Sequence, residues 1–363
     1  MQTAPGRSFA LMSYPLEVSR RPAPSLDQPA GGELALLRTI RAQAARRTRG
    51  GLSLGIGDDC ALLAPRPNEE LAVTTDLSIA GRHFRLDWHP AEAVGHRALA
   101  RGLSDLAAMG ARPVAAFLSL GVPRELTAAR RGGSWVDRFL KGLLALAAAY
   151  NVPLAGGDLA ESPLAVADIV LVGAVERGRA LLRSGAKPGD RLYLTGSLGG
   201  AALGLQRLAA LAGRPRKMET QHAPSIPKRM EAVLAAHLHP QPRIAQGLYL
   251  RRRGLATAAL DISDGLSTDL RHLCEESGVA AEVEAAALPL APGATLDQAL
   301  HGGEDYELLF TAPAAARMPR SIQGVAITPI GRILKARKGE NLILLKAEDG
   351  ATALSGGGWE HFA

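Results

Sequence analysis

The sequence predicts a two-domain protein of the α/β (α+β) class, built from layers of strands and helices. Its length of 363 residues suggests two domains or one large one. Short apolar runs that end in glycine and aspartate alternate with long helical stretches, as in layered α/β folds. Residues 176–190, rich in Arg, Gly, Lys and Pro, interrupt this alternation. We therefore expect an N-terminal domain over residues 32–178 and a C-terminal domain over residues 179–363.

The expected elements of the N-terminal half follow from apolar spacing. Residues 1–31 are rich in Pro, Ser and Arg without apolar periodicity, which is typical of a disordered leader. Residues 34–40 have the apolar spacing of a helix. Further along the half we expect a strand at 71–73, helices at 91–109 and 135–150, and a strand at 152–154.

The C-terminal half begins with a second strand, loop and helix. The apolar run at residues 192–195 predicts the strand, and Gly196, Gly199 and Gly200 follow it. The basic, Pro-containing segment 213–227 predicts a surface loop. We interpret the glycines as a packing turn, because they lack the spacing of a dinucleotide-binding fingerprint.

Composition excludes several classes of protein. No run of about eighteen apolar residues is present, which argues against a membrane span, and the N-terminus lacks the pattern of a signal peptide. Two cysteines cannot build a disulfide framework, so we expect a reducing, cytoplasmic setting. The net charge of +7 comes from scattered Lys and Arg without interleaved aromatics, which does not favour nucleic acid. A positive field would still attract anionic substrates such as nucleotides.

Acidic residues beside glycine or apolar residues stand out in this basic chain. We interpret each as partly shielded from water and without a nearby positive partner, with several at strand-to-loop junctions. Such carboxylates would repel one another in one site unless cations held them together, and Mg²⁺ takes oxygen ligands of this kind. They are Asp58, Asp59, Asp76, Asp105, Asp158, Asp261, Asp264, Glu304 and Asp305.

Simpler interpretations of these residues stay open. Asp-Gly and Gly-Asp pairs commonly form turns, as at Gly157-Asp158. Asp264, Ser104 or Asp105 could each be a helix N-cap. No P-loop motif is present, and the histidine pairs lack zinc-type spacing, so most histidines should be surface residues. Cys60 is expected to be a small buried hydrophobe rather than a nucleophile.

Taken together, the motifs resemble those of the thiamine-monophosphate kinase family, within the aminoimidazole ribonucleotide synthetase superfamily. The resemblance covers residues 32–362. Seven segments occur in the family's order: GIGDDCALL (55–63), TTD with GRHF (74–84), LSDLAAMGARP (103–113), AGGD (155–158), RSGAKPGD (183–190), DISDGL (261–266) and GGEDYELLFT (302–311).

The resemblance implies an aminoimidazole ribonucleotide synthetase-like fold and a homodimer formed through the N-terminal sheet. It implies ATP-dependent phosphorylation of thiamine monophosphate to thiamine diphosphate by direct in-line transfer, assisted by several Mg²⁺ ions. The implied Mg²⁺ ligands are Asp59, Thr74, Thr75, Asp76, Asp105, Asp158, Asp261 and Asp264. Gly157, Asp158, Arg183 and Ser263 would contact ATP, and His83, Glu304 and Trp359 would contact thiamine monophosphate.

Three departures from the family pattern concern the leader, the enlarged segment 213–227, and Ser78 and Arg82 near His83. Two alternatives stay open. One is another ATP-dependent synthetase of the superfamily, although the reactive Cys and Lys of a selenophosphate synthetase are missing before Gly55. The other is a non-catalytic nucleotide-binding maturation scaffold, against which the full acidic set argues.

Overall fold

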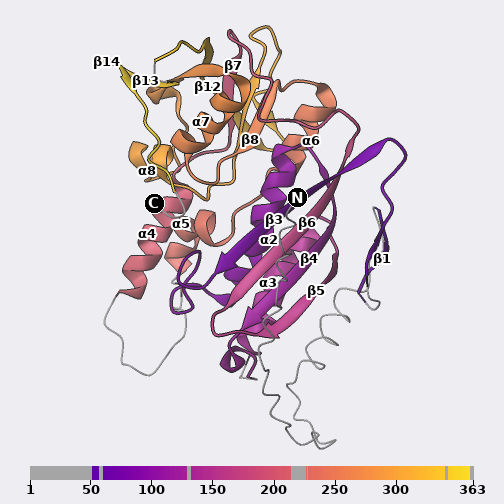
Figure 1. Cartoon of the computed structure of the whole chain (residues 1–363). Coiled ribbons are helices and arrows are strands. Elements are labelled where there is room, and N and C mark those ends of the chain that lie inside the picture. Colours follow the sequence, from indigo (N-terminus) through magenta and orange to yellow (C-terminus); the bar gives the residue numbers. More distant parts are fainter. Residues whose placement is uncertain are drawn as a thin grey trace, which may run out of the picture.

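The computed structural model describes residues 51–56, 60–128, 132–213, 226, 228–339 and 342–359, arranged in two α/β halves (Figure 1). The leader at residues 1–31, the helical spacing at 34–40 and nearly all of the loop at 213–227 lie outside the described residues. No helix within those ranges has the length and apolar character needed to cross a bilayer.

The N-terminal half is a four-stranded sheet with the order β3-β6-β4-β5. β4 and β5 are parallel, and the other neighbours are antiparallel. A short hairpin of β1 and β2 precedes the sheet. The elements are β1 (Leu52–Leu54), β2 (Leu62–Leu63), β3 (Glu69–Ile79), α2 (Ala91–Ala108), β4 (Arg112–Val122), η1 (Arg124–Leu126), α3 (Trp135–Ala149), β5 (Leu154–Glu161) and β6 (Val166–Glu176).

Helices α2 and α3 pack against each other, and α2 lies on one face of this sheet (Figure 1). Their backbones approach closely because glycine stands at both contact points: a Cβ on Gly95 would lie 1.9 Å from the carbonyl oxygen of Phe139, and one on Gly142 would lie 1.9 Å from that of Glu92. A capping box between Ser134 and Asp137 starts α3. The expected helices at 91–109 and 135–150 are thus confirmed to within one residue.

Among the described residues, the opposite face of the sheet is covered at one end, where Leu52 of β1 packs with Ala115, Ala155 and Ala174. The rest of this face carries exposed side chains, and we call it the open face. Side chains of a strand alternate between faces, so Thr74 and Asp76 of β3 lie on the helix-covered side. Leu71, Val73 and Leu77 lie on the other side, with 43%, 62% and 46% of their surface exposed. An apolar stripe of this kind is unusual on a surface that meets only water.

The C-terminal half is built on an eight-stranded mixed sheet with the order β14-β13-β9-β12-β7-β10-β8, and β11 pairs with β12. A separate apolar core lies under its helices. The elements are β7 (Arg191–Thr195), α4 (Gly200–Ala212), α5 (Lys228–Leu238), α6 (Ile244–Arg253), β8 (Ala258–Asp261), α7 (Leu266–Ser277), β9 (Val279–Glu284), η2 (Ala285–Ala287), α8 (Leu296–His301), β10 (Leu308–Ala312), β11 (Ser321–Ile322), β12 (Val325–Lys335), β13 (Ile343–Ala347) and β14 (Gly350–Ala353).

Helix α2 joins the two halves. It contacts β3 and β6 on one side and α6 and β8 on the other. Gly247 of α6 allows the close approach, since a Cβ there would lie 1.9 Å from the carbonyl oxygen of Ala107. The largest core cluster accordingly contains both Leu99 of α2 and Phe310 of β10. Any side chain that α2 directs towards this junction therefore faces residues of both halves.

Candidate active site

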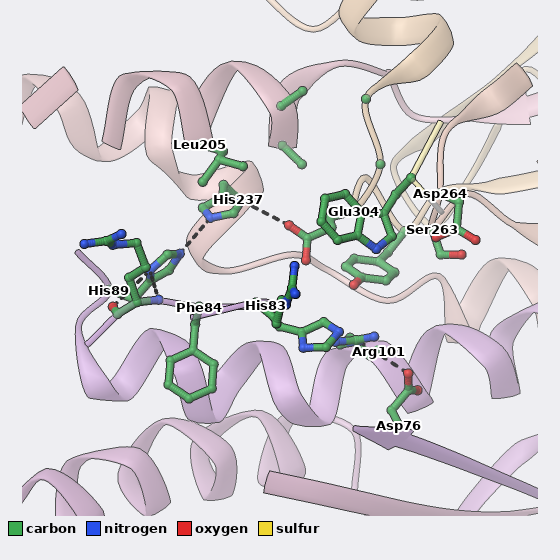
Figure 2. A pocket seen from close by; sticks show the side chains of 18 of the residues that line it. Asp76, His83, Phe84, His89, Arg101, Leu205, His237, Ser263, Asp264 and Glu304 are labelled. Carbon is green, nitrogen blue, oxygen red and sulfur yellow. Dashed lines mark hydrogen bonds and ion pairs between the residues drawn. The ribbon is translucent and has the colours of Figure 1, made fainter. Parts of the chain in front are cut away.

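A cavity of about 580 Å³ opens at the junction of the two halves. From the N-terminal half, β3, α2 and the loop after β3 line it; from the C-terminal half, the start of α4 and the loops before α7 and β10 line it. Figure 2 shows His237 and His89 at one end, Asp76 at the other, and Glu304 between them. The cavity has the size of a small-molecule site.

Three carboxylates from different elements meet at the acidic end. Asp76 comes from β3, Asp105 from α2 and Asp261 from the end of β8. Thr74 donates its hydroxyl to Asp105, and Ser104 donates to Oδ2 of Asp261 at 2.6 Å. The second bond crosses the domain junction. Residues far apart in the sequence therefore form one acidic wall.

Burial and mutual repulsion make this wall hard to ionise. Burial raises the pKa of Asp76 to about 6, helped by Asp105 and Asp168 and opposed by Arg101. Burial, then Asp105, raises the pKa of Asp261 to about 7. Burial also raises the pKa of Asp105, against the hydrogen bond from Thr74. A cation placed among these groups would relieve the cost of their charges.

The loop that follows β8 adds Ser263 and Asp264 to the cavity wall. Asp269 holds this loop, because its Oδ2 accepts the backbone N–H groups of Ser263, Asp264 and Gly265 at 3.0, 3.0 and 3.1 Å. The N-cap of α7 is Gly265, so the alternative interpretation of Asp264 as an N-cap is wrong. Ser104 and Asp105 are not N-caps either, since both lie inside α2.

Glu304 occupies the middle of the cavity and is held from both halves of the molecule. Arg97 of α2 forms an ion pair with its Oε1. The Nδ1 atom of His237 lies 3.5 Å from its Oε2. The backbone N–H of Glu304 donates to the carbonyl oxygen of Ser263 at 2.8 Å, and its φ of 68° is left-handed, a strained conformation for a residue with a side chain.

Arg97 also contacts two histidines near Glu304. Its Nη1 lies 2.5 Å from Nε2 of His237, and its Nη2 donates to the carbonyl oxygen of His83 at 3.3 Å. The Nε2 atoms of His237 and His89 are 3.0 Å apart. Burial, then the charge of Arg97, lowers the pKa of His237, so its ring is neutral at physiological pH.

The C-terminal segment closes one side of the cavity. Trp359 lines it with 52% of its surface exposed, and its backbone N–H donates to the carbonyl oxygen of Asp264 at 3.0 Å. The preceding glycines allow close packing: a Cβ on Gly358 would lie 2.1 Å from that same oxygen, and one on Gly357 would lie 2.8 Å from Nδ1 of His301. The segment is thus seated against the loop that presents Asp264.

Comparison with known proteins identifies the family. Residues 57–175 match the model of the AIR synthase related protein N-terminal domain, and residues 187–355 match that of the C-terminal domain. Thiamine-monophosphate kinase of Escherichia coli K12 is 40% identical over 330 residues, which cover 88% of this chain and 94% of the relative. The chain belongs to the thiamine-monophosphate kinase family.

Solved structures of this kinase family share the fold. Thiamine-monophosphate kinase from Stenotrophomonas maltophilia is 38% identical, with a TM-score of 0.72 over 87% of this chain and 97% of that one. A structure of AaThiL complexed with AMPPCP and TMP is 30% identical, with a TM-score of 0.68 over 91% of this chain and 97% of that one. The expected two-domain α/β fold of the superfamily is confirmed.

The structure gathers most, though not all, of the residues that the family motifs indicated. The cavity is lined by Asp76, His83, Asp105, Asp261, Ser263, Asp264, Glu304 and Trp359. Thr74 joins them through Asp105. Arg183 is exposed but lies near enough to lower the pKa of Asp105. Asp59 lies outside the described residues.

Thr75, Gly157 and Asp158 lie away from the cavity. Gly157 and Asp158 are part of strand β5, so the interpretation of this segment as a turn is wrong. Asp76 was expected to lie just beyond a strand at 71–73, but it is inside β3, which continues to Ile79. Asp158 is in register with Ser119, Asp168 and Leu77, a row on the open face of the sheet, where Thr75 is also exposed. In the single chain, the sheet separates these side chains from Asp76.

Two arginines of the site, both on α2, lie outside the family motifs, so the motifs did not indicate them. Arg97 and Arg101 pair with Glu304 and Asp76, the latter at 3.3 Å, so the interpretation of these acids as unpartnered is wrong. Helical spacing could have placed both arginines on one face of α2, since they are four residues apart. His89 and His237 are buried rather than on the surface, and Cys60 is exposed rather than buried.

Proposed function

We propose that this chain catalyses transfer of the terminal phosphoryl group of ATP to thiamine monophosphate, giving ADP and thiamine diphosphate. The observation that carries the proposal is one cavity with an acidic wall at one end and the family's acceptor residues beside it, in a chain that is 40% identical to a thiamine-monophosphate kinase. A relative of the same fold has been seen with AMPPCP and TMP, which supports a site that holds a nucleotide and the acceptor together.

We assign Gly157, Asp158, Arg183 and Ser263 to the donor side of the proposed site. Gly157 and Asp158 lie on the opposite face of the sheet in the single chain, so they would contribute only in the assembled protein. Ser263 lines the cavity, and the positive charge of Arg183 acts on Asp105. A cation at this position suits the polyphosphate of ATP. Gly157 has a φ of 149° and packs so closely on β4 that a Cβ would lie 1.9 Å from the carbonyl oxygen of Leu118. A residue with a side chain would therefore not fit at this position of β5.

The acidic wall fits bound Mg²⁺. Asp76, Asp105, Asp261 and Asp264 offer only oxygen ligands, and burial raises the pKa of the first three. Within the described ranges no group of three His, Cys, Asp or Glu side chains is close enough to hold a metal ion alone, so substrate phosphates would complete the coordination. We infer that several Mg²⁺ ions bind here, with Asp59, Thr74, Thr75 and Asp158 as further ligands. Bound Mg²⁺ would neutralise phosphate charge.

The chain's own residues orient the two substrates. Arg97 and His237 hold Glu304, and Ile79 donates its backbone N–H to Nδ1 of His83 at 3.1 Å, which fixes that ring. Trp359 offers an aromatic face to the thiazolium cation, and Glu304 a balancing negative charge. We infer direct in-line transfer without a general base, because the acceptor phosphate oxygen is already largely ionised near pH 7.

We also propose that the protein is a homodimer formed through the open face of the N-terminal sheet. The apolar stripe of Leu71, Val73 and Leu77 supports this face as the interface. A second copy covering it would lie against Thr75 and Asp158. Light scattering should give twice the mass of one chain, and Val73→Lys should halve it; a monomeric wild-type protein would refute the dimer.

A product assay tests the proposed reaction. Purified protein is incubated with ATP, Mg²⁺ and thiamine monophosphate, and thiamine diphosphate is measured directly alongside ADP. The proposal requires stoichiometric formation of both products. ADP formed equally without thiamine monophosphate would indicate a different acceptor or a simple ATPase. Nucleotide binding without any turnover would favour the maturation scaffold instead.

A further inference from the structure

Arg101 is a largely buried cation inside the cavity. It lies one helical turn after Arg97 on α2, and 19% of its side-chain surface is exposed. The other arginines of the cavity wall, Arg82 and Arg85, are exposed, and Arg85 is already paired with Asp87. Figure 2 shows Arg101 directed towards Asp76 in the interior of the site.

Acidic groups from both halves of the molecule surround this guanidinium. Burial opposes its charge, but Tyr306, Asp76, Glu304 and Asp105 together raise the pKa of Arg101. Asp76 and Asp105 belong to the acidic wall, and Glu304 belongs to the acceptor side. Arg101 is therefore a fixed positive charge between the proposed Mg²⁺ ligands and the proposed acceptor contacts.

The guanidinium uses only part of its hydrogen-bonding capacity. Its Nε lies 3.3 Å from Oδ1 of Asp76. Its Nη1 donates to the carbonyl oxygen of Leu77 at 3.3 Å and, at 3.5 Å, to Oγ of Ser78. Its Nη2 makes no hydrogen bond to any residue that the structure describes. An arginine held through Nε and Nη1, with the donors of Nη2 left over, is well suited to bind a phosphate oxygen.

We propose that Arg101 is a catalytic residue that binds the transferring phosphoryl group, donating from Nη2 to one of its oxygens while Nε stays against Asp76. The inference rests on the proposed function. In the transfer, the bond between the γ-phosphorus and the ADP oxygen breaks as a bond from the acceptor phosphate oxygen forms. Arg101 keeps its proton throughout and stabilises charge on the transferring group.

A simpler role for Arg101 would be a counterion for Asp76. Its removal would then expose a carboxylate to Mg²⁺, so Mg²⁺ binding would tighten and kcat at saturating Mg²⁺ would stay near the wild-type value. A phosphate-binding role predicts a loss of kcat that no Mg²⁺ concentration restores. The two roles therefore differ in kcat at saturation.

The experiment compares Arg101→Met and Arg101→Lys with a matched control, Arg112→Met. Arg112 also forms a partly buried ion pair, with Glu69 at 3.0 Å, but it lies outside the cavity. For each variant we would measure thiamine diphosphate formation at saturating Mg²⁺, the melting temperature, and Mg²⁺ affinity by calorimetry without substrates. Calorimetry provides a readout that does not depend on turnover.

We expect Arg101→Met to lower kcat about 100-fold, the usual cost of losing one donor to a charged transition state. Arg101→Lys should recover part of this loss. Arg112→Met should stay within about 2-fold of the wild-type kcat, since the pair that it removes lies outside the cavity. Mg²⁺ affinity of Arg101→Met should not fall. A kcat for Arg101→Met equal to that of Arg112→Met would overturn the assignment, as would a loss explained entirely by weaker Mg²⁺ binding.

If Arg101→Met does not fold, Arg101→Lys decides the question. A kcat lowered about 10-fold or more at a native melting temperature supports phosphate binding through the guanidinium fork, because lysine keeps only the charge. A wild-type kcat in this variant overturns it. Wild-type protein that makes no thiamine diphosphate would instead refute the proposed function, and with it this role.

Discussion

The acidic end and the middle of the cavity hold negative charge in opposite ways. At the acidic end, Asp105 and Asp261 receive hydroxyl donors and face each other, and burial raises the pKa of both. In the middle of the cavity, Glu304 is paired with Arg97 and approached by His237. The negative charges at the acidic end are therefore only partly balanced by the chain, whereas the charge of Glu304 is balanced by Arg97.

This difference suggests a different role for each group of carboxylates. Carboxylates that repel one another in a buried wall need a cation that the chain itself does not supply in full, which supports bound metal. A carboxylate already neutralised by an arginine has little need of metal, and its fixed position suits recognition of a cationic ring. Substitutions at the acidic end and in the middle of the cavity should therefore change different kinetic constants.

The largest effect is expected at the acidic end. Asp261→Asn should lower kcat on the order of 1,000-fold, as loss of charge stabilisation commonly does in phosphoryl transfer. The melting temperature should not fall, because the amide oxygen can still accept from Ser104 and a repelling charge is removed. Thiamine diphosphate formation at saturating Mg²⁺ measures the change in kcat, and thermal unfolding of the same preparation measures the melting temperature.

Asp137→Asn is a suitable control for this substitution. Asp137 lies in the first turn of α3 outside the cavity, and asparagine keeps an oxygen that can accept from Ser134. The variant therefore loses only a favourable negative charge at the helix start, which should cost about 0.3–1 kcal/mol and leave kcat unchanged. Normal turnover in Asp261→Asn would contradict the acidic end as the metal site. Collapse of its fold would show that the carboxylate is structural.

The acidic wall could be predicted from sequence because each member follows a short motif that stands out in a basic chain. Its pairing with arginine could not. Arg101 lies 25 positions after Asp76, and their contact depends on the rotation of α2 over β3. Local apolar spacing predicts that a helix forms, but it does not fix which charged side chain meets which strand.

A second substitution tests whether the metal site extends beyond the cavity. Asp158→Asn on the open face of the sheet should also reduce kcat about 100-fold or more if Asp158 acts as a ligand when the protein is assembled. The fold should persist, since the side chain is exposed. Kinetics together with light scattering would separate lost catalysis from lost assembly. A fully active variant would confine the metal ligands to the cavity.

The sequence does not indicate the face on which Asp158 lies, because Gly156-Gly157-Asp158 has the composition of a turn. Glycine usually weakens a strand, so its presence inside β5 gives no β signal. The strand forms there because Gly157 can pack against the backbone of Leu118 where no side chain would fit. Close backbone approach is a tertiary requirement that a local pattern does not report.

A smaller effect is expected in the middle of the cavity. Arg97→Met leaves Glu304 without its partner, so it should raise KM for thiamine monophosphate about 10-fold, equivalent to roughly 1.4 kcal/mol. Breaking a buried pair should also lower stability by about 3 kcal/mol. Initial rates with each substrate varied in turn, together with denaturant unfolding, measure the two changes.

Arg243→Met provides the comparison for this pair. Arg243 forms an ion pair with Glu307, which is buried but does not line the cavity. The control should lose similar stability while KM for thiamine monophosphate stays near the wild-type value. Equal changes of KM in both variants would mean that Arg97 acts only through general stability and does not position Glu304.

The smallest effect is expected where the C-terminal segment closes the cavity. A thiazolium cation against an indole face is stabilised by about 0.5–2 kcal/mol, so Trp359→Ala should raise KM for thiamine monophosphate several-fold. KM for ATP and the melting temperature should barely move, because half of the surface of Trp359 is exposed and the hydrogen bond to Asp264 uses only backbone atoms. Trp359→Phe should retain part of the affinity, since phenylalanine keeps an aromatic face. If stability falls instead, or both substrates weaken equally, the indole seals the packed segment around Gly358 and the ring of the acceptor binds elsewhere in the cavity.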